Sequence, residues 1–169
     1  KKIGGSIILG DKPTFLSLLR SPVLLLAFGF GSGLSKKAPG TVGSLVALVI
    51  WILIADLALI PYITFLIISG LIGVYICGVA SEKLGVHDHG GIVWDEFVGL
   101  WIAMICLPVS WLSIILGFGL FRFFDIVKPW PISWADKNVS GGLGIMLDDV
   151  FAGFAAAASI ALIQHFGLF

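Results

Sequence analysis

Long apolar runs alternate with short polar segments along most of the chain. A helix needs about 20 mostly apolar residues to cross a bilayer, because every backbone N–H and C=O must be hydrogen-bonded internally in hydrocarbon. Five runs approach that length, and we predict that they form spanning helices at residues 42–60, 62–80, 92–107, 111–127 and 143–166. Thr41 is the predicted N-cap of the first helix, and Pro61 is predicted to end it.

The N-terminal part of the chain follows a different pattern. Residues 1–20 mix charged and apolar side chains, and we expect them to lie at the membrane surface. Residues 21–30 are apolar but too short to span, which suggests an interfacial or re-entrant segment before a glycine-rich loop. We therefore predict an all-α, polytopic membrane bundle that forms one domain over residues 1–169.

Composition supports a membrane protein. The chain is 59% hydrophobic and 12% charged, with a mean hydropathy of +1.10, whereas a soluble domain is about 25% charged. Ten basic and ten acidic residues give zero formal charge, so no overall field points to nucleic acid.

The predicted spans place all ten Lys and Arg residues on one side of the membrane, together with nine of the ten acidic residues. The positive-inside rule makes this the cytoplasmic side. The tryptophans fit aromatic belts at the two interfaces, notably Trp94, Trp101, Trp130 and Trp134.

Acidic residues enter three predicted spans at a similar shallow depth below the cytoplasmic surface. Charged groups inside a membrane mark functional sites by default, and Mg²⁺ prefers the oxygen ligands that carboxylates supply. We predict Glu96, Asp125 and Asp149 as direct magnesium ligands, with Asp95 and Asp148 supporting them or holding a second ion. The alternative is a set of interfacial salt bridges with basic residues, namely Arg122, Lys128 and Lys83.

Cations and small residues near these acids are candidates for binding an anionic substrate. Arg122, Asp125 and Lys128 recur at i, i+3 and i+6, so they share roughly one helix face, either around a substrate or as a salt-bridge ladder. The glycine-rich loop and the helix start after it could cradle phosphate, and its candidate residues are Gly33, Lys36, Lys37, Thr41 and Ser44. A flexible interfacial loop is the alternative.

Two histidines flank Asp88 in the sequence HDH. His87 and His89 are candidates for proton transfer near neutral pH, and the alternative for each is a hydrogen-bonded loop histidine. The surrounding carboxylates favour Mg²⁺ over a transition metal here.

Four motifs occur together in the order and approximate spacing of the bacterial phosphatidylglycerophosphatase A family: GFGSGLSKKAPGTVGSL, HDHGGIVWDEFVGLW, FRFFDIVKPWPI and GGLGIMLDDVFAG. The resemblance runs from about residue 27 to residue 153. It implies an all-helical, Mg²⁺-dependent enzyme of the bacterial inner membrane that converts the phospholipid phosphatidylglycerophosphate to phosphatidylglycerol. It also implies that the site comprises the five acids, accompanied by His87, Asp88, His89, Arg122 and Lys128.

The sequence lacks the motifs of phosphatases that form a covalent intermediate, so we expect direct attack by metal-activated water. The main alternative is a small ion- or proton-coupled transporter, since intramembrane acids also serve transport pathways. A transporter would carry polar groups near the midplane and in both halves of the membrane, whereas one half is nearly bare here. A CDP-alcohol phosphotransferase would need an aspartate motif that the chain lacks.

Overall fold

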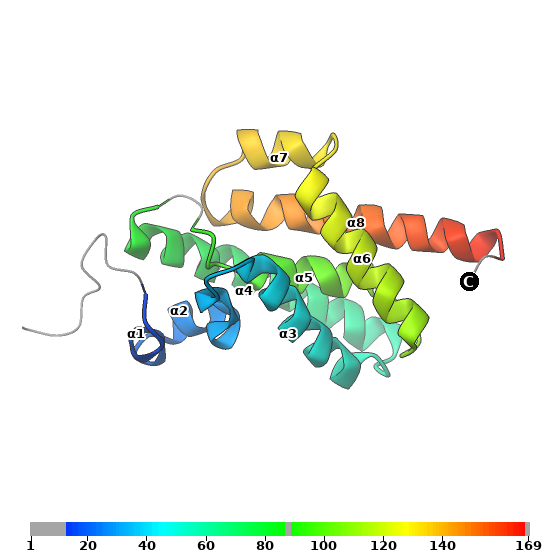
Figure 1. The fold of residues 1–169 in the computed structure, drawn as a ribbon, viewed down its shortest axis with the longest axis horizontal. Coiled ribbons are helices and arrows are strands. Elements are labelled where there is room, and N and C mark those ends of the chain that lie inside the picture. Colours follow the sequence, from blue (N-terminus) through cyan, green and yellow to red (C-terminus); the bar gives the residue numbers. More distant parts are fainter. Residues whose placement is uncertain (1–12, 87–88, 168–169) are drawn as a thin grey trace, which may run out of the picture.

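The computed structural model describes residues 13–86 and 89–167, and throughout these residues the regular structure is helical. The all-α prediction is confirmed. Five helices form a bundle (Figure 1): α3 (Pro39–Ile54), α4 (Leu59–Leu84), α5 (Trp94–Ala103), α6 (Trp111–Val127) and α8 (Gly141–His165).

Three short helices precede the bundle at its N-terminal end: α1 (Phe15–Leu19), α2 (Pro22–Ala27) and the 3₁₀ helix η1 (Gly29–Leu34). The predicted surface segment 1–20 is described only from residue 13. In that part, α1 buries Leu18 and leaves Phe15, Leu16 and Leu19 exposed. The α2 helix is tied to the bundle because the amide of Val93 donates to the carbonyl oxygen of Ala27 at 2.8 Å.

The α5 helix forms the centre of the bundle. Nine of its ten residues are buried, and α3, α4, α6 and α8 all pack against it. Side chains fasten it to its neighbours: Trp94 Nε1 donates to the carbonyl oxygen of Ser69 at 3.1 Å, and Trp101 Nε1 donates to that of Ala47 at 2.9 Å. Both tryptophans are therefore buried core residues, and their predicted place in an aromatic belt is wrong.

The surface of the bundle suits lipid better than water. The α4 and α8 helices are long and apolar enough to cross a membrane, and large apolar side chains such as Ile60 and Leu71 are exposed on α4. Exposed apolar surface on this scale marks contact with a membrane or another partner. The other three predicted spans are shorter, since α3 has 16 residues, α6 has 17 and α5 has ten, so length alone does not confirm five spans.

Helix boundaries agree with the predictions to different degrees. The α6 helix covers residues 111–127 as predicted, and α8 differs from its predicted range by two residues at the start and one at the end. The prediction that Pro61 separates the first two spans is wrong, because α3 ends at Ile54 and Pro61 is the third residue of α4. The predicted N-cap at Thr41 is also wrong: Ala38 takes that position, and Thr41 lies in the first turn of α3.

One further α-helix, α7 (Ile132–Asn138), was not predicted and connects α6 to α8. It buries Ile132 and Ala135, while Trp130, just before it, and Trp134 are exposed. A position at the membrane interface stays a prediction for these two tryptophans.

Candidate active site

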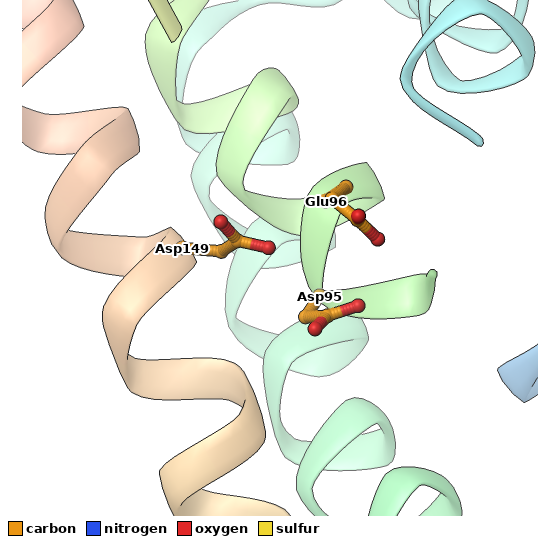
Figure 2. A group of neighbouring side chains, drawn as sticks. All are labelled: Asp95, Glu96 and Asp149. Atoms are coloured by element: carbon orange, nitrogen blue, oxygen red, sulfur yellow. The ribbon is translucent and has the colours of Figure 1, made fainter. Parts of the chain in front are cut away.

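Three acidic side chains from two helices form the centre of the site. Asp95 and Glu96 lie in the first turn of α5, and Asp149 projects from α8 toward them (Figure 2). One carboxylate oxygen from each residue lies within 4.8 Å of the other two. The first-turn position favours the two α5 acids, because the N-terminus of a helix carries partial positive charge.

Two glycines allow the helices to approach closely enough to form this cluster. A methyl group at Gly99 of α5 would lie 2.6 Å from the carbonyl oxygen of Asp149, and one at Gly153 of α8 would lie 2.4 Å from the carbonyl oxygen of Gly99. Both contacts are too short to tolerate a side chain without movement. The backbone of α8 therefore lies directly against α5 at Asp149.

The cluster has the composition expected of a site for a hard divalent cation. Among the described residues, the buried oxygens Glu96 Oε2 and Asp149 Oδ1 have no hydrogen-bond partner. A buried acceptor without a partner is costly and calls for an explanation such as a bound ion. Opposite ligands of an octahedral Mg²⁺ lie about 4 Å apart, and the three carboxylate oxygens of the cluster all lie within 4.8 Å of one another. The residues present thus fit Mg²⁺.

Arg122 of α6 joins the cluster to Asp125. Its Nη1 donates to Asp125 Oδ2 and lies 3.9 Å from Glu96 Oε1. Asp125 also interacts electrostatically with both Glu96 and Asp149. The predicted ligand Asp125 therefore lies at the edge of the cluster, paired with a cation, whereas Asp95 lies within it.

Lys128 pairs with Asp148, the fifth predicted acid, which is not part of the three-acid cluster. Its Nζ donates to Asp148 Oδ2 and to Asp136 Oδ1, both at 2.6 Å. Burial alone would lower the pKa of Lys128, but the hydrogen bonds to Asp136 and Asp148 outweigh it and hold that pKa above its ordinary value. Two of the predicted salt bridges thus form, through Arg122 and Lys128, while Lys83 instead donates to Ser21 Oγ at 3.4 Å.

The predicted phosphate cradle is only partly available for binding. The amide of Gly33 donates to the carbonyl oxygen of Phe28 at 3.0 Å, and Ser44 Oγ donates to that of Gly40 at 2.8 Å. Both donors are engaged within the protein. Lys36 and Lys37 are exposed, and Thr41 is partly buried, so a role for these three in binding substrate stays a prediction.

The structure describes only one of the two histidines predicted to transfer protons. His87 and Asp88 lie outside the described residues. His89 is partly buried, and its Nδ1 accepts a hydrogen bond from the amide of Gly91 at 3.0 Å. That bond matches the alternative of a hydrogen-bonded loop histidine and leaves Nε2 for other contacts.

Two residues at the site were not predicted. Asp136 of α7 shares Lys128 with Asp148, and Gly40 of α3 lies against the Glu96 carboxylate. Asp136 lies eight residues after Lys128, in the helix α7 that was not predicted. The sequence spacing therefore did not indicate that the two residues pair. Gly40 belongs to the glycine-rich loop motif, but only the packing of α3 on α5 reveals its neighbour.

Comparison with known proteins gives one consistent result. The family model described as phosphatidylglycerophosphatase A matches residues 25–164. Phosphatidylglycerophosphatase A of Escherichia coli (strain K12) is 48% identical over 148 residues, covering 87% of this chain and 86% of that protein. Phosphatidylglycerophosphatase A of Haemophilus influenzae (strain ATCC 51907 / DSM 11121 / KW20 / Rd) is 45% identical over 155 residues, covering 90% of this chain and 94% of that protein.

A third relative carries a different substrate in its name. This Bacteroides thetaiotaomicron protein has the provisional name phosphatidylinositol-3-phosphatase and is 37% identical over 161 residues, covering 89% of this chain and 95% of that protein. No solved structure matches the chain. The four sequence motifs and the cluster of Asp95, Glu96 and Asp149 all fall within the matched region.

Proposed function

The chain belongs to the phosphatidylglycerophosphatase A family, and from that premise we propose that it hydrolyses the phosphomonoester of phosphatidylglycerophosphate to phosphatidylglycerol and phosphate. The observation that carries the proposal is the cluster of Asp95, Glu96 and Asp149, in which the buried oxygens Glu96 Oε2 and Asp149 Oδ1 lack a hydrogen-bond donor among the described residues. A phosphatase that works on a membrane lipid needs such a site at the depth of the headgroup.

Mg²⁺ is the proposed cofactor, held by Asp95, Glu96 and Asp149, with Asp125 close enough to join them. When bound, the ion supplies positive charge for the phosphate and lowers the pKa of water. The protein fixes the direction from which phosphate approaches, since α5 and α8 wall the cluster on two sides.

Charged groups around the cluster carry the other roles. Arg122, whose Nη1 lies 3.9 Å from Glu96 Oε1, has the proposed role of binding equatorial phosphate oxygens as charge develops in phosphoryl transfer. A carboxylate of the cluster, or His87 or His89 as predicted from sequence, accepts the proton of the attacking water. Lys128 orients Asp148 and α7, and the exposed Lys36 and Lys37 attract anionic headgroups.

The enzyme is proposed to be a multi-pass protein of the bacterial inner membrane with its site facing the cytoplasm. Consecutive long helices run in alternating directions, so the turns after α3 and α5 and the end of α8 lie together at one end of the bundle (Figure 1). The described basic residues at helix ends, such as Lys37 before α3 and Lys83 in the last turn of α4, belong to the opposite end. A site on that side meets the headgroup of a lipid whose acyl chains stay in the bilayer.

Phosphate release from phosphatidylglycerophosphate by the purified, detergent-solubilised protein tests this proposal. We expect hydrolysis with Mg²⁺, loss of activity with EDTA, and recovery when Mg²⁺ is restored. Phosphatidylinositol 3-phosphate, assayed in parallel, tests whether the enzyme is specific for the glycerol headgroup. The absence of hydrolysis, combined with ion flux in proteoliposomes, would instead favour the transporter alternative.

A further inference from the structure

The backbone of α3 lies against the acidic cluster at Gly40. A methyl group at this position would overlap Glu96 Oε1 and lie 3.4 Å from Arg122 Nη1. The same Glu96 oxygen lies 3.9 Å from Arg122 Nη1. The Glu96 carboxylate is therefore confined between the first turn of α3 and the guanidinium group of α6.

Space, not backbone conformation, is what requires glycine at this position. Gly40 is the second residue of α3 and does not have a positive φ, so an L-amino acid could adopt its backbone conformation. Glycine also weakens a helix by up to about 1 kcal/mol relative to alanine. A purely local explanation would therefore favour alanine.

Gly40 differs from the other glycines that the structure describes. Those with close neighbours mainly face backbone atoms or apolar side chains, such as Gly33 against Gly91 or Gly43 against Val93. The nearest neighbour of a methyl group at Gly40 is instead a carboxylate oxygen, that of Glu96. The missing side chain of Gly40 thus leaves room for a charged group of the site.

We propose that Gly40 is a positioning residue that lets the Glu96 carboxylate lie between α3 and Arg122, in the orientation that completes the divalent-cation site with Asp95 and Asp149. This inference rests on the proposed function for its metal and deepens it by making α3 a third wall of the site. A methyl group at position 40 would rotate the Glu96 carboxylate and separate the three acids.

Gly40→Ala tests the proposal, with Mn²⁺ as a spectroscopic probe of the cation site. We expect the dissociation constant for Mn²⁺, measured by electron paramagnetic resonance on the protein in detergent, to rise by about 10–100-fold, the range found when residues that orient metal ligands are changed. The Mg²⁺ concentration for half-maximal activity should rise in parallel. The unfolding temperature without metal should stay equal or increase.

Gly119→Ala is the matched control, because Gly119 lies within α6 and has no atom within 4 Å of an added methyl group. It should bind Mn²⁺ as the unaltered protein does. Equal Mn²⁺ binding by Gly40→Ala and the unaltered protein would overturn the proposal, as would a failure of the unaltered protein to bind Mn²⁺.

A second variant covers the case in which Gly40→Ala is unstable. Glu96→Asp shortens the side chain that the methyl group meets, so adding it should restore folding to Gly40→Ala. If folding is not restored, the proposed contact is wrong. If the unaltered protein binds Mn²⁺ but does not hydrolyse phosphatidylglycerophosphate, the proposed activity fails while the effect of Gly40 on Mn²⁺ binding is still measured.

Discussion

Asp149 is buried, with 3% of its surface exposed, among other carboxylates. Asn has the same shape and no charge, so Asp149→Asn should remove electrostatic repulsion from the metal-free protein. We expect an unfolding temperature without metal that is unchanged or higher. We also expect phosphatase activity at least about 100-fold lower, the upper end of the cost of changing groups that support metal ligands.

Asp56→Asn is the control for this substitution, since Asp56 is exposed in the turn between α3 and α4, at the other end of the bundle. Its activity and unfolding temperature should match those of the unaltered protein. Activity of Asp149→Asn equal to that of Asp56→Asn would remove Asp149 from the proposed ligand set.

Lys128 lies between the carboxylates of Asp136 and Asp148. Removing its charge should destabilise the protein mainly because Asp148, the more buried of the two, loses its cation. Lys128→Met leaves the buried Asp148 without its cation, so we expect the free energy of unfolding to fall by about 1–3 kcal/mol. Lys128→Met combined with Asp148→Asn should recover most of that loss, because neither charge then remains. Thermal unfolding in detergent measures the coupling between the two changes.

Lys137→Met serves as the control for the Lys128 pair, because Lys137 is an exposed residue of α7. If the Lys128→Met, Asp148→Asn double variant is stable but has lost activity, Lys128 contacts substrate in addition to holding Asp148. Additive stability losses in the two single variants would show that the ion pair contributes little.

The candidate acids stand out in the sequence because charge is rare in apolar segments and costly there. Which of these acids lie together could not be predicted, because that depends on how α6 and α8 rotate against α5. The structure brings Asp95 into the cluster and pairs Asp125 with Arg122. The role of Gly40 depends on contact between two helices, which no local pattern encodes.

The crossing of α5 and α8 determines how close the acids lie. Gly99→Ala would bring a methyl group to 2.6 Å from both the carbonyl oxygen of Asp149 and Cε2 of Phe121. We expect this overpacking to lower the free energy of unfolding by about 1–3 kcal/mol and to weaken Mn²⁺ binding.

Gly70→Ala in α4 is the control for the Gly99 variant, because a methyl group there has open space. The unfolding temperature of Gly70→Ala in detergent should be equal to or slightly higher than that of the unaltered protein. If Gly99→Ala unfolds at the same temperature as Gly70→Ala, the helices have room to separate and the close crossing is not required.

The length of the apolar runs predicted helix boundaries well where a capping residue marks the end of the helix. Ser110 caps α6 through a hydrogen bond from the amide of Ser113, and that boundary was correct. Pro61 misled the prediction because a proline in the first turn of a helix loses no backbone hydrogen bond. The α5 helix is shorter than its apolar run, because Met104 ends it and Cys106 has a left-handed φ of 59°.

Orientation in the membrane follows from which end of the bundle carries the basic residues. Cysteines introduced singly at Lys37 and Leu57 should react with a membrane-impermeant thiol reagent from opposite sides. Lys37→Cys should be labelled in inverted membrane vesicles and Leu57→Cys in spheroplasts. The exposed native Cys106 should first be replaced, for example by Asn, which tolerates its positive φ.

Labelling of both cysteines from the same side would contradict the alternating arrangement of α3 and α4. Labelling of Lys37→Cys only from the periplasmic side would invert the proposed orientation and place the site away from the cytoplasm. The buried Cys77 provides an internal control, because it should react only after unfolding.

The enclosure of α5 separates the chemistry from the thickness of the bilayer. This helix is about 15 Å long, from a rise of about 1.5 Å per residue, and the helices around it cover nine of its ten residues. In the proposed membrane arrangement α4 faces lipid, and it can tilt when the acyl chains of the host membrane lengthen or shorten. Asp95 and Glu96 belong to the enclosed helix, so hydrophobic mismatch reaches them only after the surrounding helices have absorbed most of it.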